Sequence, residues 1–498
     1  MPDPTPLLYA PIVLPALAAL AYAVFGWRTW TAWAGVATTG AQLTAAVALA
    51  PRLLDGTARA TAGGLLRADA LTGYLLLVIS AVAVIATWAS VGHIRLERAA
   101  GRTDAADARR YGVLVHAFLA AMGAAALADN LGLMWVALEA TTVITAFLVG
   151  HRRDRRGLEA AWKYVVLCSA GIAMAFLGTV CMYAAALHAG GHGTTALNWT
   201  FLLGHAHTLD PGVVRLAAGL AVLGFGTKAG LAPVHAWLPD AHSQAPAPVS
   251  ALMSGVLLSV AFTAILRYKI ITDQVLGPAY LRALLIAAAL ASLAVAALLL
   301  IAQRDIKRML AYSSIEHMGL AALAAAIGGR LAAAALLLHI LGHGLAKSVA
   351  FTGAGQILQT TGTSRIADIR GLIARRPALA GTFGFAIAAL AGLPPFPLFA
   401  SELGIARSGA SAGLGWALAA ALAALLVIFA ALARHTFTML LGVAPPRHSP
   451  DVVAPVGTRA SGAVAPLVLA LTAAAVLGTV LGPLHPLLNA AATIVGAH

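Results

Sequence analysis

Long apolar stretches separated by short polar connections recur along the whole chain. A helix needs roughly 20 apolar residues to cross the hydrocarbon core of a bilayer, so this pattern predicts membrane-spanning helices. We expect fourteen of them, beginning near residues 7, 30, 71, 111, 131, 163, 212, 246, 282, 309, 331, 379, 412 and 463. The largest polar stretch, about residues 188–211, is too short for a folded soluble domain. The predicted fold class is therefore an all-α integral membrane protein built as one membrane domain.

Composition supports this prediction and removes two other classes of protein. Of the 498 residues, 60% are hydrophobic and only 10% are charged, whereas soluble domains carry roughly 25% charged residues, which excludes an ordinary soluble enzyme. The net charge of +14 arises from basic residues in short loops. They form no Lys/Arg-rich tail or face, so we expect the lipid bilayer as a partner and no nucleic acid.

The distribution of basic residues also predicts an orientation. The chain opens without a basic segment and carries Asp3, so the first apolar run is expected to be a retained helix and not a cleaved signal peptide. Most loop lysines and arginines, including Arg447 and Arg459, fall in odd-numbered connections. The positive-inside rule then places both termini outside, because an even number of spans returns the chain to its starting side. The alanine-rich composition indicates a GC-rich bacterium, and hence its inner membrane.

Two glycine–proline stretches interrupt predicted spans at corresponding places. Residues 230–233 (GLAP) end the seventh span, and residues 392–395 (GLPP) lie within the twelfth, five helices later. Proline removes a backbone donor, and a broken helix at membrane depth is tolerated only where its backbone faces protein or water. Paired breaks indicate an internally repeated transporter, inverted because five is odd. Ordinary kinks in a packed bundle are the alternative.

Charged residues inside the spans are the main candidates for chemistry. Glu139 lies in the middle of a span, and Lys228 stands two residues before the first break. An isolated ionised group at this depth is expensive, so the two are expected to pair or to meet in a hydrated cavity. A glutamate and a lysine in such surroundings can be shifted between ionised and neutral forms by small movements, which suits a proton carrier.

A second group of titratable residues follows on later helices. Glu316 and His317 are adjacent, and His339, His343 and Lys347 recur every fourth residue on one helical face. The alternative is that each histidine bonds a carbonyl and that Lys347 reaches a surface. We interpret the whole set as a proton pathway because so many polar groups at depth are costly as mere packing. Its predicted members are Glu139, Lys228, His242, His317, His339, His343, Lys347 and Glu402.

The sequence offers no cofactor site of its own. Cys168 and Cys181, both in one apolar span, cannot build an iron–sulfur cluster or a CxxC redox pair. Residues 224–230 fit neither a GxGxxG nor a Walker pattern. The histidines of the long polar loop show no ordered spacing. We therefore predict no cofactor or metal in this chain, and any electron transfer is expected in another subunit.

Two longer motifs resemble those of a known family. Residues 226–243 (GTKAGLAPVHAWLPDAHS) and 305–314 (DIKRMLAYSS) are similar to the signatures of the proton-translocating antiporter-like family of complex I, Mrp antiporters and membrane-bound hydrogenases. The resemblance implies two inverted five-helix repeats, helices four to eight and nine to thirteen. The implied segments are 1–110, 111–267 (first repeat), 282–442 (second repeat) and 443–498.

The same resemblance assigns roles to individual residues. It makes Glu139 the fifth-helix glutamate, Lys228 the seventh-helix lysine, Lys347 with its histidines the central axis, and Glu402 the distal exit. The eighth helix departs from the family's pattern, because Ser259 occupies the place of a lysine in the quinone-reducing M-type subunit. We expect His339 or His242 to bridge this gap.

Shorter segments indicate the subgroup. Residues 138–142 (LEATT), 158–164 (LEAAWKY) and 314–319 (SIEHMG) most resemble the F-type subunit of hydrogenase-4 and formate hydrogenlyase complexes. This implies a non-catalytic, proton-pumping subunit beside other membrane subunits and a peripheral redox arm that holds iron–sulfur clusters and a nickel–iron centre. The alternatives are a cation/proton antiporter subunit, the membrane half of an inorganic-carbon accumulation pair, and a structural scaffold. The scaffold leaves Glu139 and Lys228 unexplained.

Overall fold

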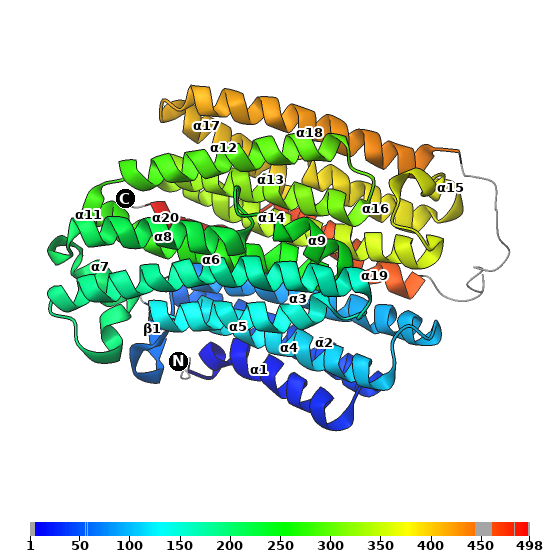
Figure 1. The fold of residues 1–498 in the computed structure, drawn as a ribbon, viewed down its shortest axis with the longest axis horizontal. Coiled ribbons are helices and arrows are strands. Elements are labelled where there is room, and N and C mark those ends of the chain that lie inside the picture. Colours follow the sequence, from blue (N-terminus) through cyan, green and yellow to red (C-terminus); the bar gives the residue numbers. More distant parts are fainter. Residues whose placement is uncertain (1–4, 55, 57, 444–460, 483, 497–498) are drawn as a thin grey trace.

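The structure is a computed structural model that describes residues 5–54, 56, 58–443, 461–482 and 484–496. Nearly all of the described chain is helical, and the long helices run side by side along one direction (Figure 1). The only strands in the described ranges are β1 (Arg59–Thr61) and β2 (Leu66–Ala68), which form a short antiparallel hairpin. The prediction of an all-α membrane protein is confirmed. Asp3, Arg447 and Arg459 lie outside the described residues.

The helices of the first half extend to the first break and just beyond it. They are α1 (Thr5–Phe25), α2 (Thr29–Leu49), α3 (Ala70–Ala99), α4 (Ala105–Leu127), α5 (Leu131–Val149), α6 (Arg155–His188), α7 (Trp199–Gly204), α8 (Pro211–Ala229), α9 (Trp237–Gln244) and α10 (Ala247–Leu252). A π-helical turn, Met253–Leu257, joins α10 to the next helix.

The second half continues with equally long helices. They are α11 (Leu258–Leu276), α12 (Ala279–Ile301), α13 (Ile306–Ile327), α14 (Gly329–Thr361), α15 (Leu372–Arg375), α16 (Pro377–Leu390), α17 (Pro397–Ser411), α18 (Gly415–Leu441), α19 (Ser461–Thr479) and α20 (Leu484–Gly496).

Each of the fourteen predicted spans coincides with a helix, and the largest differences in starting position are at α4 and α6. Eleven described helices are long and apolar enough to cross a membrane, or up to twelve if the bent pair α19 and α20 forms one span. The helix α2 is not among them, because its threonines lower its hydropathy. The helix α16 is too short, because the chain breaks after it. The chain is thus a multi-span membrane protein, while the total of fourteen stays a prediction.

Burial separates a central layer of helices from a lipid-facing one. The most apolar window is fully buried in α13 and 94% buried in α14, but only 28% buried in α1 and α18. Helices at the periphery present apolar side chains to lipid, whereas central helices contact only protein. Polar groups on α13 and α14 are therefore shielded from the bilayer by the surrounding helices.

Both predicted breaks are present. The helix α8 ends at Ala229, Gly230 adopts a left-handed conformation with φ of 77°, and helical structure resumes at Trp237. In the second half, α16 ends at Leu390, Gly392 has φ of 66°, and α17 begins at Pro397. A left-handed backbone suits glycine because it lacks a Cβ. The inverted relation of the two repeats stays a prediction.

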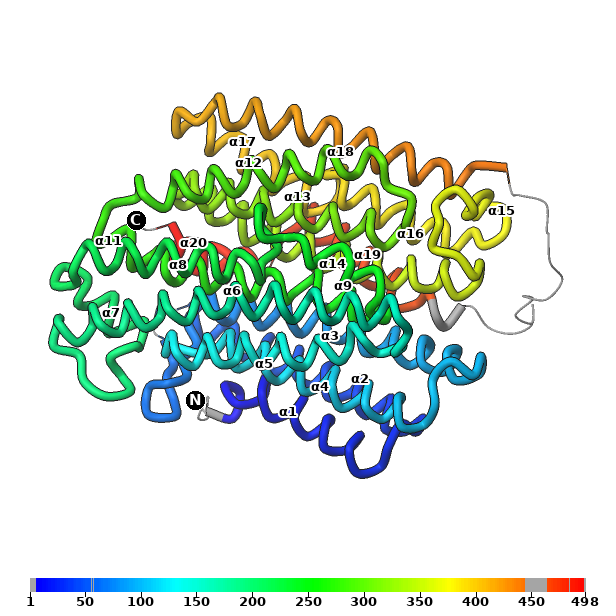
Figure 2. Tube along the Cα trace, viewed as in Figure 1, coloured from blue at the N-terminus to red at the C-terminus, as the bar shows by residue number. Residues whose placement is uncertain are grey.

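The two ends of the described chain lie at the same end of the helix bundle (Figure 2). The Tyr9 hydroxyl lies 2.8 Å from the Thr61 hydroxyl, so the start of α1 stands beside the β hairpin. At the other terminus, Gly496 lies against Gly329 at the start of α14. An even number of crossings produces this arrangement, and the prediction that this side faces outward stays open.

A buried ion pair holds the start of α3 against α11. Arg267 donates to both carboxylate oxygens of Asp69, at 2.7 and 3.0 Å, and its guanidinium stacks over Trp199. Arg67 lies on the other side, 2.9 Å from the same carboxylate. Burial alone would raise the pKa of Asp69, but the two guanidinium groups hold that pKa well below its usual range.

We expect Asp69→Asn to lower the free energy of unfolding by about 3 to 5 kcal/mol, because the Arg267 guanidinium is left buried without its partner. Since the pKa of Asp69 is depressed in the folded state, the pair stabilises the fold above about pH 4, and its contribution is lost as the pH falls further. Thermal unfolding in detergent, followed against pH, measures both effects. Asp368→Asn, which breaks an exposed pair with Arg365, is the control. Equal stability of the two variants would contradict the expectation.

Candidate functional site

Lys228 lies in the last turn of α8, just before the first break, and is fully buried. Its ammonium donates to the hydroxyls of Thr142 and Tyr164, each at 2.8 Å. Tyr164 is in turn bonded to the hydroxyl of Thr145 at 2.6 Å. Two neutral hydroxyls from α5 and α6, and no carboxylate of the described chain, therefore complete the surroundings of this buried cation.

Glu139 lies one helical turn before Thr142 on α5. One of its carboxylate oxygens is buried and has no hydrogen-bond partner among the described residues. No described ion pair joins Glu139 to Lys228, so the two groups meet around Thr142 and are not in direct contact. Of the two arrangements expected from the sequence, the direct pair is not formed.

His242 of α9 stands between the first break and the central helices. It is fully buried, and neither ring nitrogen has a hydrogen-bond partner in the part of the chain that the structure describes. Its ring stacks on Phe351 of α14 at 5.1 Å between centroids. On its other side, Trp237 lies 6.3 Å from His242 and 4.9 Å from Tyr164, between ring centroids. His242 thus links the surroundings of Lys228 to α14.

Lys347 lies one turn before Phe351 on α14. Like Lys228, it is bonded to neutral oxygens of a neighbouring helix. Its ammonium donates to the carbonyl of Leu310 at 2.7 Å and to the Ser313 hydroxyl, both on α13. The side chain is fully buried and does not reach a surface. A backbone carbonyl and a hydroxyl again satisfy a buried cation without a carboxylate.

Three histidines form a compact cluster between α13 and α14. Nδ1 of His317 lies 3.2 Å from Nε2 of His339, and the rings of His317 and His343 are 5.1 Å apart. Nδ1 of His339 lies 3.0 Å from the Ser401 hydroxyl on α17. Among the described residues, the rings contact one another and the Ser401 hydroxyl, and the alternative that these histidines only pack stays open.

The cluster ends at two carboxyl groups near the second break. Glu316 is buried, and one of its oxygens has no hydrogen-bond partner among the described residues. Glu402 on α17 follows Ser401, and its carboxylate lies directly against Gly392, where an added Cβ would stand 2.3 Å from an oxygen. Both glutamates line a cavity of about 290 Å³ whose remaining wall is apolar and comes from α18 and from Ala391 at the end of α16.

His317, His339 and Glu402 also form a possible metal-ligand set. Each offers one ligand atom, and these atoms lie within 4.8 Å of one another. Imidazole and carboxylate together are typical of zinc sites. The short His317–His339 distance is equally that of a hydrogen bond, so the same geometry also fits a hydrogen-bonded pair of rings.

The residues predicted from the sequence fall into two assemblies. Glu139 and Lys228 belong to the first, whereas His242 leads to the second, which contains His317, His339, His343, Lys347 and Glu402. Ser259, where the family's pattern has a lysine, is buried on α11 and its hydroxyl has no partner in the described chain. Which of these residues act on protons stays a prediction.

Sequence reasoning missed the neutral partners of the buried lysines and of His339. The hydroxyl partners of the lysines are Thr142, Tyr164 and Ser313, and the partner of His339 is Ser401. A signal existed for Thr142, which follows Glu139 by one turn on the same helical face, and for Ser401, which precedes Glu402. Hydroxyl residues in apolar spans are common, and only the packing of separate helices distinguishes these from the others.

Comparison with known proteins shows the family to which this chain belongs. The sequence profile of a family described as NADH:quinone oxidoreductase/Mrp antiporter, TM, matches residues 128–427. The hydrogenase-4 component F homolog of Methylacidiphilum infernorum is 42% identical over 342 residues, which covers 68% of this chain and 71% of the relative.

Two solved structures share the fold. A chain of respiratory complex I from Thermus thermophilus with bound Aureothin is 27% identical and superposes with a TM-score of 0.74, covering 95% of this chain and 98% of that one. A chain of the Mrp complex from Dietzia sp. DQ12-45-1b is 22% identical with a TM-score of 0.84, covering 99% and 97%.

Proposed function

Because this chain belongs to the NADH:quinone oxidoreductase/Mrp antiporter transmembrane family, we propose that it is the proton-translocating membrane subunit of a hydrogenase-type or complex I-like oxidoreductase. The similarity to a hydrogenase-4 component F homolog favours the hydrogenase type. The observation that carries the proposal is a row of buried titratable groups that continues from α5 through α8, α9, α14 and α13 to α17.

The first assembly supplies a proton-binding group that is poised to change its charge. A buried ammonium is costly unless its surroundings compensate it, and Lys228 has only the hydroxyls of Thr142 and Tyr164 as acceptors. A carboxylate one turn away, on Glu139, acts on this ammonium without neutralising it by contact. Small changes in the charge or position of Glu139 therefore alter the balance between protonated and neutral Lys228.

His242 supplies the connection that Ser259 cannot. A serine hydroxyl does not gain or lose a proton near neutral pH, whereas an imidazole does. Neither ring nitrogen of His242 has a hydrogen-bond partner among the described residues, and its ring contacts Trp237 and Phe351, the latter one turn from Lys347 on α14. His339 instead bonds Ser401 beside Glu402, at the distal end of the row. Of the two bridging candidates, we therefore assign His242.

The distal assembly leads the proton towards the second break. From Lys347 the row continues through His343, His317 and His339, whose rings are in contact or within hydrogen-bonding distance. Glu316 and Glu402 line the cavity of about 290 Å³ at its end. A cavity with two carboxyl groups is a suitable place for a proton to leave the row for water.

Redox partners would drive this movement from outside the chain. In the proposed complex, iron–sulfur clusters and a nickel–iron centre belong to a peripheral arm, and other membrane subunits lie alongside this one. The inner membrane of a bacterium, with both termini outside, is the proposed location. The similarity of fold to a chain of an Mrp complex keeps cation/proton antiport without redox chemistry as the second candidate function.

Replacing Glu139 by glutamine tests the proton pathway. We expect Glu139→Gln to reduce proton translocation by about a hundredfold, because the amide carries no charge that can act on Lys228. Uptake of protons by inverted vesicles, measured with a pH-sensitive dye during turnover, gives the rate. Glu159→Gln, at an exposed residue of α6 that pairs with Lys163, is the control. Unchanged pumping in Glu139→Gln, with the complex intact, would refute the pathway.

The bridging role of His242 predicts a second loss. We expect His242→Leu to lower the translocation rate at least about tenfold, since leucine fills the space but offers no site for a proton. His435→Leu, at a buried histidine that only bonds the carbonyl of Leu300, should retain the rate. Both variants are compared in the same vesicle assay at equal protein content. Full translocation in His242→Leu would remove this residue from the row.

Copurification separates the redox pump from the antiporter. We expect mass spectrometry of the tagged chain, isolated from its native membrane in mild detergent, to identify nickel–iron hydrogenase-like and iron–sulfur subunits. Recovery of other small membrane subunits alone, or of a zinc-binding carbonic-anhydrase-like partner, would place the protein among transporters without redox chemistry. An untagged strain treated in the same way is the control for nonspecific capture.

A further inference from the structure

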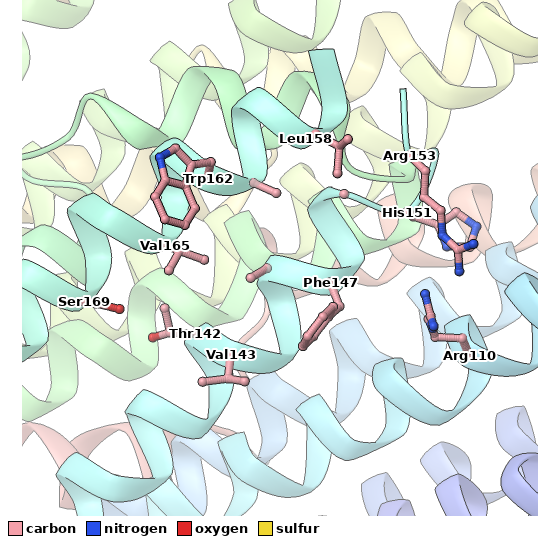
Figure 3. A pocket seen from close by; sticks show the side chains of 13 residues that line it. Arg110, Thr142, Val143, Phe147, His151, Arg153, Leu158, Trp162, Val165 and Ser169 are labelled. Atoms are coloured by element: carbon pink, nitrogen blue, oxygen red, sulfur yellow. The ribbon is translucent and has the colours of Figure 1, made fainter. Parts of the chain in front are cut away.

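A second and larger cavity, of about 540 Å³, is lined by none of the predicted proton-pathway residues, although one end of it reaches Thr142. It is an open groove between α5 and α6, bordered by the first turns of α4 and by the connection that follows α5 (Figure 3). The side chains that shape it are Arg110, Thr142, Val143, Phe147, His151, Arg153, Leu158, Trp162, Val165 and Ser169.

The two ends of the groove differ in chemistry. At one end, the nitrogen-bearing groups of Arg110, His151 and Arg153 gather close together (Figure 3). The walls beyond them are apolar, and Phe147 and Trp162 are 59% and 70% exposed. Along α6, the groove runs from Leu158 to Ser169, roughly 16 Å at the rise of an α-helix, which is long enough for most of an acyl chain.

The basic end of the groove carries more positive charge than its neighbouring carboxylate balances, and it is therefore suited to binding an anion. Arg110 has no carboxylate partner in the described ranges, and Arg153 shares only Asp107, at 2.9 Å. Neighbouring guanidinium groups repel each other unless an anion lies between them, and their planar forks bind phosphate with two parallel hydrogen bonds. Burial lowers the pKa of His151, so its neutral ring adds one N–H donor to the site.

The location fits the boundary between bilayer and water. Arg110 lies near the start of α4, and His151 and Arg153 lie in the loop between α5 and α6, at the end of the bundle where the loop arginines are concentrated. Phe147 of α5 and Trp162 of α6 face outward, on the side that the hydrocarbon covers. An anionic phospholipid matches both parts of the groove, because its head group can bind at the basic end while its acyl chain lies along the apolar wall.

We propose that this groove binds an anionic glycerophospholipid, with its phosphate between Arg110 and Arg153 and one acyl chain along Phe147 and Trp162. The chain would end near Thr142, whose hydroxyl accepts the hydrogen bond of Lys228. If the proposed proton pathway is correct, the lipid tail therefore also closes the outer side of the Lys228 surroundings against the bilayer. The binding site itself does not depend on that pathway.

Lipid binding is measured on the complete protein in nanodiscs or after partial delipidation. We expect native mass spectrometry to show phosphatidylglycerol bound at least about tenfold more tightly than phosphatidylcholine with the same acyl chains. Arg110→Gln combined with Arg153→Gln should abolish this preference. Arg109→Gln combined with Arg156→Gln, at exposed arginines of the same region that do not line the groove, should retain it.

A photo-crosslinking amino acid in place of Trp162 identifies what covers the groove in the native membrane. Crosslinking to phospholipid supports the proposal, and crosslinking to a helix of another subunit overturns it. The proposal is equally overturned if phosphatidylglycerol shows no preference, or if the Arg110/Arg153 double variant keeps it. Because these readouts measure lipid, failure of proton translocation leaves them unchanged, and the two proposals are tested separately.

Discussion

The cost of placing charge inside a bilayer is the constraint on which this structure depends. Lys228 and Lys347 satisfy it in the same way, since each ammonium is fully buried and, within the described chain, bonded only to neutral oxygens of neighbouring helices. Neutral oxygens stabilise the ammonium but leave it able to lose its proton. A carboxylate in direct contact would instead hold it in the charged form. Two lysines held in this manner are suited to binding and releasing protons, whereas tightly paired ions such as Asp69 and Arg267 are suited to holding helices together.

The broken helices make these arrangements possible. The first break allows α9 to turn back, so that His242 stacks on Phe351 of α14 and connects the two assemblies. The second break brings Glu402 against Gly392, at the end of the histidine cluster. Central helices that carry polar groups are surrounded by more apolar ones, of which α1 and α18 are mostly exposed to lipid. The surrounding helices thus shield the polar interior of the described bundle from lipid.

Membership in the antiporter-like family and the departure at Ser259 are consistent with each other in this arrangement. The proposed pathway requires a titratable group between the surroundings of Lys228 and those of Lys347, and the buried ring of His242 occupies that region. The row can therefore continue by a different side chain without a change of fold. Hydroxyl groups of Thr142, Ser313 and Ser401 complete it, and they contribute hydrogen bonds without adding charge.

The sequence by itself determined the helices, the two breaks and the titratable residues, because hydropathy, glycine and proline act locally along the chain. It could not determine that Glu139 and Lys228 meet around Thr142 without direct contact, or that His339 bonds Ser401 while His242 leads to α14. Nor could the sequence determine the groove lined by Arg110 and Arg153, since its walls come from separate helices. Such contacts depend on how helices pack, and packing brings together residues whose separation along the chain carries no signal.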